Sequence, residues 1–162
     1  FLTIENGIDV LINNAGYLVN EPFGQISESN LRTMFEVNLL GPFRLIQNVI
    51  PLLRKDNSHV INIGSMGGVQ GSVKFPGLSA YSSSKGGLSI LTECLAEEYK
   101  ESNIKFNCLA LGAVQTEMLN EAFPGYEASV SAIEMAQYIY SFALNGSRFI
   151  NGKVISVSNS TP

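Results

Sequence analysis

Short apolar runs alternate with longer amphipathic segments along this chain, and the alternation predicts strands that alternate with helices. The first run, Asp-Val-Leu-Ile-Asn at residues 9–13, is almost continuously apolar, which is typical of a strand covered on both faces of a parallel sheet. Three later runs also predict strands. They are residues 60–63, 104–111 and 153–158.

Apolar residues at helical spacing predict one long helix over residues 27–53 and another over residues 81–101. Pro42 lies inside the first, so we expect a bend or local distortion there. Ser131 and Glu134 have the Ser-x-x-Glu spacing of a capping box and start a third helix. Units of this kind about 30 residues long indicate an α/β fold with a doubly wound, Rossmann-like parallel sheet.

Length and composition limit the class of protein. The 162 residues suffice for one domain, and 45% hydrophobic with 15% charged residues is the composition of a globular chain. A net charge of -4 argues against nucleic acid as a partner, because phosphate binding needs a basic face. No apolar run approaches the ~20 residues of a membrane span. The first residues lack the features of a signal peptide, so we expect a cytoplasmic protein and no membrane partner.

Three other residues carry simple expectations. Cys94 and Cys108 lie in apolar runs, so we expect small buried side chains rather than a redox pair. His59 follows a polar turn and is expected at the surface. No His, Cys, Asp or Glu cluster has metal-ligand spacing, so no metal site is expected.

Tyr81 and Lys85 are four residues apart, so on a helix they point the same way. A phenol with a pKa of about 10 is a poor base at neutral pH, and a nearby ammonium lowers that pKa. Such a phenol can exchange a proton with a carbonyl or alcohol oxygen. The pair alone is weak evidence, because Tyr and Lys often have this spacing on solvated helices.

The neighbouring motifs change this interpretation. Gly64-Ser65 follows a predicted strand and precedes a glycine-rich loop, and Asn13-Asn14-Ala15-Gly16 follows the first strand. Asn38 lies in an otherwise apolar helix, where an unpaired amide costs a few kcal/mol. Its side chain either has a functional role or satisfies backbone groups freed near Pro42, and both can hold.

With these motifs in this order, the chain resembles the short-chain dehydrogenase/reductase family from about residue 9 to residue 157. The matching stretches are Asn13-Asn14-Ala15-Gly16, Val37-Asn38-Leu39, Ile63-Gly64-Ser65, Tyr81-x-x-x-Lys85 and Leu111-Gly112-Ala113-Val114-Gln115-Thr116. The resemblance implies an NAD(P)(H)-dependent oxidoreductase that interconverts a carbonyl and an alcohol on a small-molecule substrate.

The resemblance also implies roles for single residues. Tyr81 would be the general acid/base, and Ser65 would hydrogen-bond the reacting oxygen. Lys85 would lower the Tyr81 pKa and hold the nicotinamide ribose. Asn38 would anchor a water that links Lys85 to solvent.

The implied cofactor is NAD or NADP, and the residues that choose between them fall outside this sequence. Tyr81 and Lys85 would contact it together with further residues of two loops. These are Asn14, Ala15, Gly16, Val114 and Thr116. The family usually forms homodimers or homotetramers through helices such as residues 27–53 and 81–101, so we expect a homo-oligomer.

The chain departs from the family pattern at its start, where the glycine-rich phosphate turn is missing. Residues 64–71 do not replace it, because no helix begins at their end. We therefore expect residues 1–162 to form one partial Rossmann-like domain, the second half of the sheet, with a bare edge at residues 9–13. The alternative function is a catalytically silent member that binds a ligand or assembles an oligomer.

Smaller features concern packing and the substrate. Gly86-Gly87 suggests a close helix-helix approach, expected at a subunit interface, although local tolerance explains it almost as well. Residues 74–76 lengthen the stretch between Ser65 and Tyr81 and should reshape one wall of the substrate pocket. After Thr116, three side chains either form a lid over an apolar ligand or pack on neighbouring structure. They are Met118, Phe123 and Tyr126.

Overall fold

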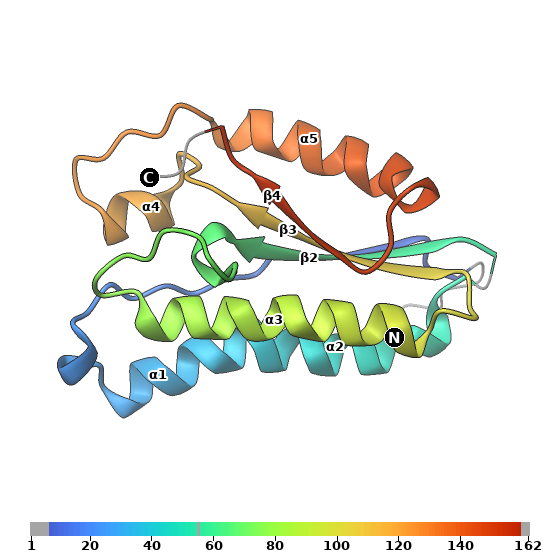
Figure 1. Cartoon of the computed structure of the whole chain (residues 1–162), viewed down its shortest axis with the longest axis horizontal. Coiled ribbons are helices and arrows are strands. Elements are labelled where there is room, and N and C mark those ends of the chain that lie inside the picture. The colour runs from blue at the N-terminus through green and yellow to red at the C-terminus, as the bar shows by residue number, and fades with distance from the viewer. Residues whose placement is uncertain (1–6, 55, 160–162) are drawn as a thin grey trace.

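Four parallel strands form one sheet in the order β1-β2-β3-β4. The computed structural model describes residues 7–54 and 56–159. Its strands are β1 (Val10–Asn13), β2 (Ser58–Ser65), β3 (Ile104–Leu111) and β4 (Lys153–Val157). In Figure 1, α1, α2 and α3 lie along one side of the sheet and α5 along the other. This layered parallel arrangement confirms the predicted doubly wound α/β fold.

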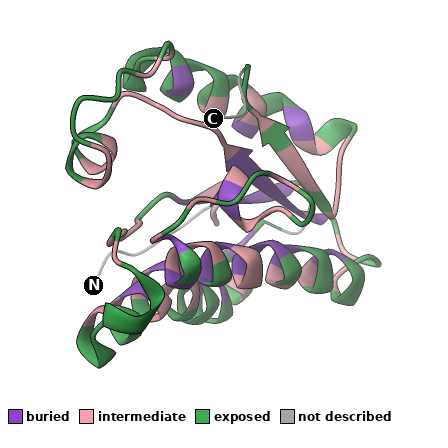
Figure 2. Cartoon of the chain, turned by 60° about the vertical axis from the view of Figure 1, so that its left-hand side comes forward, coloured by how far each residue is buried: buried purple, intermediate pink, exposed green. Residues whose placement is uncertain are grey.

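The central strands are the most buried part of the chain (Figure 2). Successive side chains of a strand point to opposite faces of its sheet. Val60 accordingly packs in a core with Ile46 and Phe106, whereas Ile61 belongs to a second core with Leu109 and Ala143. The first core faces α2 and α3, and the second faces α5. Burial on both faces explains why residues 60–63 of β2 form a mostly apolar run rather than an alternating pattern.

The segment predicted as one long helix is divided by a distortion near Pro42. It consists of α1 (Glu28–Phe35), the π-helical η2 (Glu36–Leu40), α2 (Gly41–Val49) and the 3-10 turn η3 (Ile50–Leu52). Pro42 has no N–H for the carbonyl of Asn38, and the Gly41 N–H bonds to the Glu36 carbonyl five residues back. The expected distortion is confirmed, and it falls in the turn that holds Asn38.

The remaining elements follow their local sequence signals closely. Helix α3 (Ser79–Glu98) begins just before Tyr81, and α5 (Ala132–Asn145) begins at the predicted capping box. In that box the Ser131 N–H donates to Glu134 Oε2 at 2.9 Å, and the Glu134 N–H donates to Ser131 Oγ at 3.2 Å. Shorter helices complete the chain. They are η1 (Phe23–Gln25), η4 (Met66–Gly68), α4 (Glu117–Ala122) and η5 (Gly146–Arg148).

Strand β1 forms one edge of the sheet, as expected, and a buried polar chain ties it to the interior. The Asn13 amide donates to Asn62 Oδ1 at 2.7 Å, and the Asn62 amide donates to Thr92 Oγ1 of α3 at 2.9 Å. All three side chains are buried. Each amide therefore has a partner that offsets the cost of burying it.

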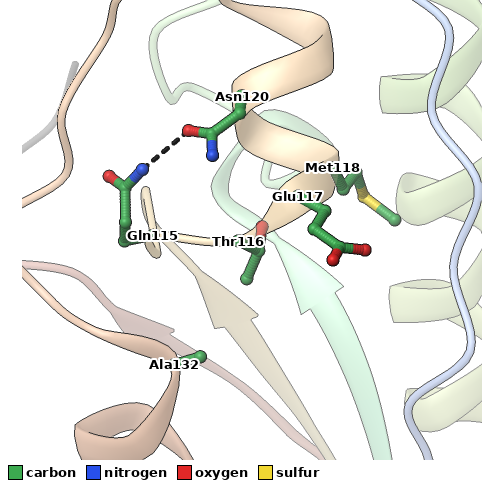
Figure 3. A pocket seen from close by; sticks show the side chains of 6 residues that line it. All are labelled: Gln115, Thr116, Glu117, Met118, Asn120 and Ala132. Atoms are coloured by element: carbon green, nitrogen blue, oxygen red, sulfur yellow. Dashed lines mark hydrogen bonds between the residues drawn. The ribbon is translucent and has the colours of Figure 1, made fainter.

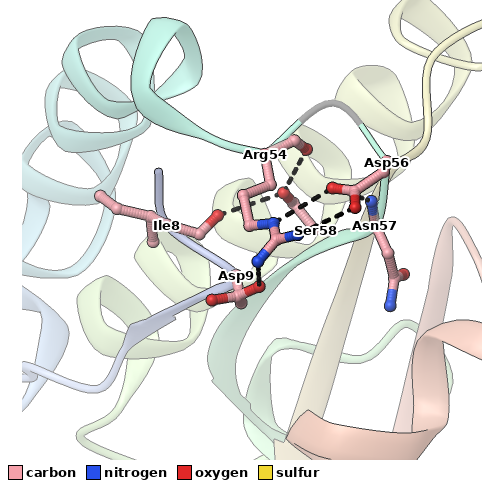
Figure 4. Close-up of polar contacts among 6 residues, drawn as sticks. All are labelled: Ile8, Asp9, Arg54, Asp56, Asn57 and Ser58. Carbon is pink, nitrogen blue, oxygen red and sulfur yellow. Dashed lines mark hydrogen bonds and ion pairs between the residues drawn. The ribbon is translucent and has the colours of Figure 1, made fainter. Parts of the chain in front are cut away.

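Charged side chains surround the start of β1 (Figure 4). Arg54 pairs with Asp56 at 3.0 Å and with Asp9 at 3.4 Å. These groups are exposed, so the pairs add little to stability. The Ser58 hydroxyl donates to the Ile8 carbonyl at 3.2 Å, so the backbone entering β1 is also fixed to the start of β2.

His59 is buried, with 2% of its surface exposed, so its expected place at the surface is wrong. Strand β2 begins at Ser58, earlier than predicted, and this carries the imidazole into the core beneath α5. Its Nδ1 faces the Ala143 carbonyl at 3.2 Å, and its Nε2 faces the Asn107 amide at 3.0 Å. Donation from Nδ1 and acceptance at Nε2 satisfy both nitrogens of a neutral ring.

One packing expectation is wrong, and a second is confirmed in part. Cys108 is buried as expected, but Cys94 is exposed, because it lies on the outer face of α3. The close approach at Gly86-Gly87 exists, but it lies within this chain. A Cβ on Gly87 would lie 2.9 Å from a Leu39 methyl, and the Gly86 backbone contacts Gly68. A role of these glycines at a subunit interface stays a prediction.

Among residues 7–54 and 56–159, no helix combines the length and the apolar character needed to cross a bilayer.

Candidate functional site

The candidate residues meet at the carboxyl edge of the sheet, where parallel α/β sheets bind their ligands. β1 ends at Asn13, β2 at Ser65 and β3 at Leu111, so three candidate segments leave the same edge. Asn14, Ala15 and Gly16 follow β1 directly, and Val114 and Thr116 follow β3. Tyr81 and Lys85 approach the site from the first turns of α3. The topology thus gathers segments that are far apart in the sequence.

Tyr81 is partly buried in the first turn of α3, and Ser65 is partly buried at the end of β2. Burial raises the pKa of the Tyr81 phenol above its usual value, and a side-chain hydrogen bond with Ser65 partly offsets that rise. The Ser65 oxygen also accepts from the Gly67 N–H at 3.2 Å. A phenol with a raised pKa stays protonated at neutral pH, the state that can donate to a carbonyl oxygen.

Lys85 is 3% exposed and lies one helical turn beyond Tyr81. Its Nζ is 6.0 Å from the centroid of the Tyr81 ring and donates to the Ile63 carbonyl at 2.8 Å. Burial lowers its pKa to about 8, with a small opposing effect from Cys108. The pKa of Tyr81 is shifted by burial and by Ser65, and the expected lowering of that pKa by Lys85 stays a prediction. The ammonium is held by a β2 carbonyl rather than against the phenol oxygen.

Asn38 is fully buried, and its side chain joins three segments. Its Oδ1 accepts from the Tyr17 N–H at 2.8 Å, and its Nδ2 donates to the Tyr17 carbonyl at 2.8 Å. The same Nδ2 donates to Ser84 Oγ at 2.9 Å. The amide thus satisfies backbone groups, but those of the segment after Gly16 rather than those freed near Pro42.

Ser84 was not singled out from the sequence, although it belongs to this arrangement. Its hydroxyl is buried, accepts from Asn38 and donates to the Tyr81 carbonyl at 2.8 Å. Tyr81-Ser82-Ser83-Ser84-Lys85 holds three adjacent serines, and Ser83 is exposed. Ser84 differs from the adjacent serines in its contact with Asn38, which lies on a separate helix, so the local sequence contains no signal for it.

Gly16 brings the turn after β1 close to the candidate side chains. A Cβ placed on it would lie 3.7 Å from both Lys85 Nζ and Asn38 Oδ1, and 3.5 Å from Met118 Cε. Asn14 and Ala15, the two preceding candidates, are exposed. The structure therefore brings Gly16, Asn38 and Lys85 together in one group. Asn14 and Ala15 lie beside this group and are exposed, so a ligand could contact them.

The segment after β3 borders an open pocket of about 580 Å³ (Figure 3). Thr116 lines it and caps α4, accepting from the Leu119 N–H at 3.2 Å. In one wall of the pocket, the Gln115 amide donates a 2.6 Å hydrogen bond to Asn120 Oδ1. The other lining residues are Glu117, Met118 and Ala132. Met118 also contacts the Gly16 turn, so this pocket adjoins the group around Lys85.

The fold and these motifs place the chain in a known family. A family model described as short chain dehydrogenase matches residues 3–127, and this chain belongs to that family. Nodulation protein G of Rhizobium sp. (strain N33) is 31% identical over 163 residues, covering 94% of this chain and 65% of the relative. The 3-oxoacyl-(acyl-carrier-protein) reductase FabG of Thermotoga maritima is 32% identical over 162 residues, covering 93% and 64%.

Solved structures agree with this assignment. A 4-hydroxyisoleucine dehydrogenase mutant complexed with NADH and succinate superposes with a TM-score of 0.82 at 25% identity, over 94% of this chain and 68% of its own. A short chain dehydrogenase from Escherichia coli CFT073 complexed with NADPH gives a TM-score of 0.83 at 25% identity, over 93% and 63%. The chain spans about 65% of the length of the curated relatives it matches. That this chain lacks the glycine-rich phosphate turn of the family stays a prediction.

Proposed function

We propose that this chain carries the acid/base half of an NAD(P)(H)-dependent oxidoreductase that interconverts a carbonyl and an alcohol. One observation carries the proposal. Tyr81 and Ser65 interact at the carboxyl edge of the sheet, with the Lys85 ammonium one helical turn away. Family membership and relatives solved with NADH and NADPH support it.

Tyr81 is assigned the proton transfer. In the reductive direction, its phenol donates a proton to the substrate oxygen while the carbonyl carbon gains hydride, and the carbonyl π bond becomes a C–H and an O–H bond. The Ser65 hydroxyl orients the same oxygen. Tyr81 is then left as phenolate and must regain a proton before the next turnover. Oxidation of an alcohol uses the reverse steps.

The residues around Gly16 and Lys85 fit a nicotinamide dinucleotide. The Lys85 ammonium has three donors, and among the described residues its Nζ makes one hydrogen bond, to Ile63. Its other donors are available for ribose hydroxyls. Asn14, Ala15 and Gly16 would lie along the adenosine side, with Val114 and Thr116 toward the nicotinamide amide or pyrophosphate. When bound, the dinucleotide supplies or accepts the hydride.

Asn38 is assigned a water that links Lys85 to solvent. Its side chain already bonds to Tyr17 and Ser84, so the backbone carbonyl is the group we assign to that water. Pro42 supports this assignment, because it has no N–H to occupy that carbonyl in the helical pattern. The phenolate of Tyr81 would regain its proton along this route.

Assembly is proposed as a homodimer or homotetramer. Large apolar side chains on the outer faces of α2 and α3 are exposed, including Phe43 at 41% and Ile90 at 60%. A second copy that packs on these faces would remove that apolar surface from water. The competing proposal, a silent member that binds a ligand or assembles without turnover, keeps this surface but needs no proton-donating phenol.

Tyr81→Phe tests the proposal. The variant should lose turnover of a carbonyl substrate with NADH or NADPH, because it has no acidic hydrogen, while dinucleotide binding measured by fluorescence persists. Tyr140→Phe is the matched control, since Tyr140 is 67% exposed on α5, away from the site. Turnover like the wild type in Tyr81→Phe would refute the role of Tyr81. Dinucleotide binding with no turnover in the wild type would favour the silent member.

A further inference from the structure

Two aromatic rings from separate segments meet across the candidate site. The centroids of Phe75 and Phe123 are 6.3 Å apart, and the ring planes are inclined by 70°. This is the edge-to-face geometry that aromatic pairs favour. Phe75 lies in the loop between Ser65 and Tyr81, whereas Phe123 follows α4 directly. The contact therefore joins the loop after β2 to the segment after β3.

Both segments are anchored beside the proposed catalytic groups. The Ser72 hydroxyl donates to the Val69 carbonyl at 2.9 Å, and the Leu78 N–H donates to the Phe75 carbonyl at 3.2 Å, just before α3 begins. On the other side, Met118 of α4 contacts the Gly16 turn. Phe75 and Phe123 thus extend from the two elements that flank Ser65, Tyr81 and Lys85.

Asn20 braces the two segments from a third direction. Its Nδ2 donates to the Ala122 carbonyl, immediately before Phe123, at 2.9 Å. Its Oδ1 occupies the space that a Cβ on Gly77 would need, and the φ of 85° at Gly77 favours glycine. The next residue, Glu21, donates its N–H to the Gly77 carbonyl at 3.1 Å. The loop and the α4 segment are therefore held in a fixed relation.

Two of the side chains exposed near this contact are largely apolar. Val73 is 49% exposed and Tyr126 is 40% exposed, one on each segment. The nearby ammonium of Lys74 is directed back into its own loop, to the Val69 carbonyl at 2.5 Å and the Ser72 hydroxyl at 2.6 Å. An apolar group that packs against the two rings would lose unfavourable contact with water.

Resting on the function proposed above, we propose that Phe75 and Phe123, braced by Asn20, determine substrate specificity. They select carbonyl compounds that carry an apolar, preferably aromatic, substituent beside the reacting group. The substituent packs against the two rings and makes an edge-to-face contact of the same kind that they make with each other. Of the two alternatives for Phe123, a lid or packing on its neighbours, the structure shows packing, and the neighbour is Phe75.

The experiment compares two probes, 1-phenyl-1,2-propanedione and dihydroxyacetone, with NADH and NADPH. The ratio of their kcat/KM values should favour the phenyl compound in the wild type. It should fall by about tenfold or more in Phe75→Ala and in Phe123→Ala, since lost apolar contacts of this size change discrimination by roughly 10–200-fold. Phe149→Ala is the matched control, because Phe149 is 81% exposed and lies beyond α5. Circular dichroism establishes that each variant is folded.

Saturation-transfer NMR of phenyl-probe binding separates this proposal from the proposed function. Binding that weakens in Phe75→Ala and Phe123→Ala, but not in Phe149→Ala, supports the specificity assignment even if no turnover occurs, and then the proposed catalysis is at fault. Turnover with a ratio unchanged in both variants overturns the assignment and leaves the catalysis intact. Absence of phenyl-probe binding in the wild type, or a wild-type preference for dihydroxyacetone, also overturns it.

Discussion

The Nζ atom of Lys85 donates a 2.8 Å hydrogen bond to the Ile63 carbonyl, and this bond fixes the ammonium between β2 and α3. The same burial that fixes it lowers its pKa to about 8. The charge of this group is therefore adjustable near physiological pH, unlike that of a surface lysine.

The first prediction concerns this titration. Between about pH 8 and pH 10.5 the folded protein binds fewer protons than the unfolded chain, so stability falls as pH drops through that range and becomes constant below it. Nuclear magnetic resonance of ¹³Cε-labelled lysine should show one midpoint near pH 8, assigned by its loss in Lys85→Met. Lys100 is the internal comparison, because a hydrogen bond with Glu97 raises its pKa. A Lys85 midpoint above pH 10 would contradict the prediction.

The second prediction concerns Ser84. Ser84→Ala should lower the free energy of unfolding by about 1–3 kcal/mol, because it removes the bond to the Tyr81 carbonyl and leaves one buried donor of Asn38 unpaired. The bonds of Asn38 to Tyr17 remain. Amide exchange at Tyr17 should become faster, since Asn38 then holds that N–H less rigidly. Ser83→Ala changes the neighbouring exposed serine in the same way and should alter neither quantity. Equal Tyr17 exchange in both variants would show that Ser84 does not steady this amide.

The third prediction uses His59, the one histidine of the chain. Burial lowers its pKa, so below about pH 6.5 the unfolded chain takes up a proton that the folded protein refuses. Stability should fall with decreasing pH by up to about 1.4 kcal/mol per pH unit. Urea unfolding of the wild type and His59→Gln between pH 7.5 and pH 5 measures the difference. His59→Gln should be less stable at pH 7.5 yet less sensitive to acid, and parallel pH profiles would contradict this account.

The fourth prediction concerns the contact of the glycine-rich loop with α3. A Cβ on Gly68 would lie 2.8 Å from the Gly86 nitrogen and the Lys85 carbonyl carbon, so Gly68→Ala must separate η4 from the helix. We expect a loss of about 1–3 kcal/mol in urea unfolding, as for other overpacked sites. Gly24→Ala meets no atom within 4 Å and should change stability by less than about 0.5 kcal/mol. Similar values for the two variants would rule out a tight contact.

Local patterns were sufficient for much of the fold. The strand at residues 104–111 and the capping box at Ser131 depend on neighbouring residues, and both are as predicted. Pro42 indicated the distortion, because a missing N–H acts within one helix. The order of motifs along the chain also identified the family that the comparison with known proteins shows.

The errors and omissions concern contacts between distant segments. Whether His59 and Cys94 are buried depends on α5 and on which face of α3 points outward, and neither follows from the adjoining residues. The partner of Gly87 is Leu39, and that of Asn38 is Ser84. Phe75 and Phe123 meet because two loops leave the same sheet edge. Tertiary packing decides each of these cases.

The amides of Asn13 and Asn62 have a further consequence for β1. They lie on directly paired residues of β1 and β2, so their hydrogen bond exists in one alignment of these strands. If β1 slid by two residues, Leu11 or the turn after β1 would lie beside Asn62. The buried Asn62 amide would then have no partner, which would lower the free energy of unfolding by about 1–3 kcal/mol. The same slide would displace Gly16 from its place beside Lys85 by about 7 Å, the length of two residues along a strand. Within residues 7–54 and 56–159, β1 pairs with β2 alone, and this amide contact keeps the alignment on which the site depends.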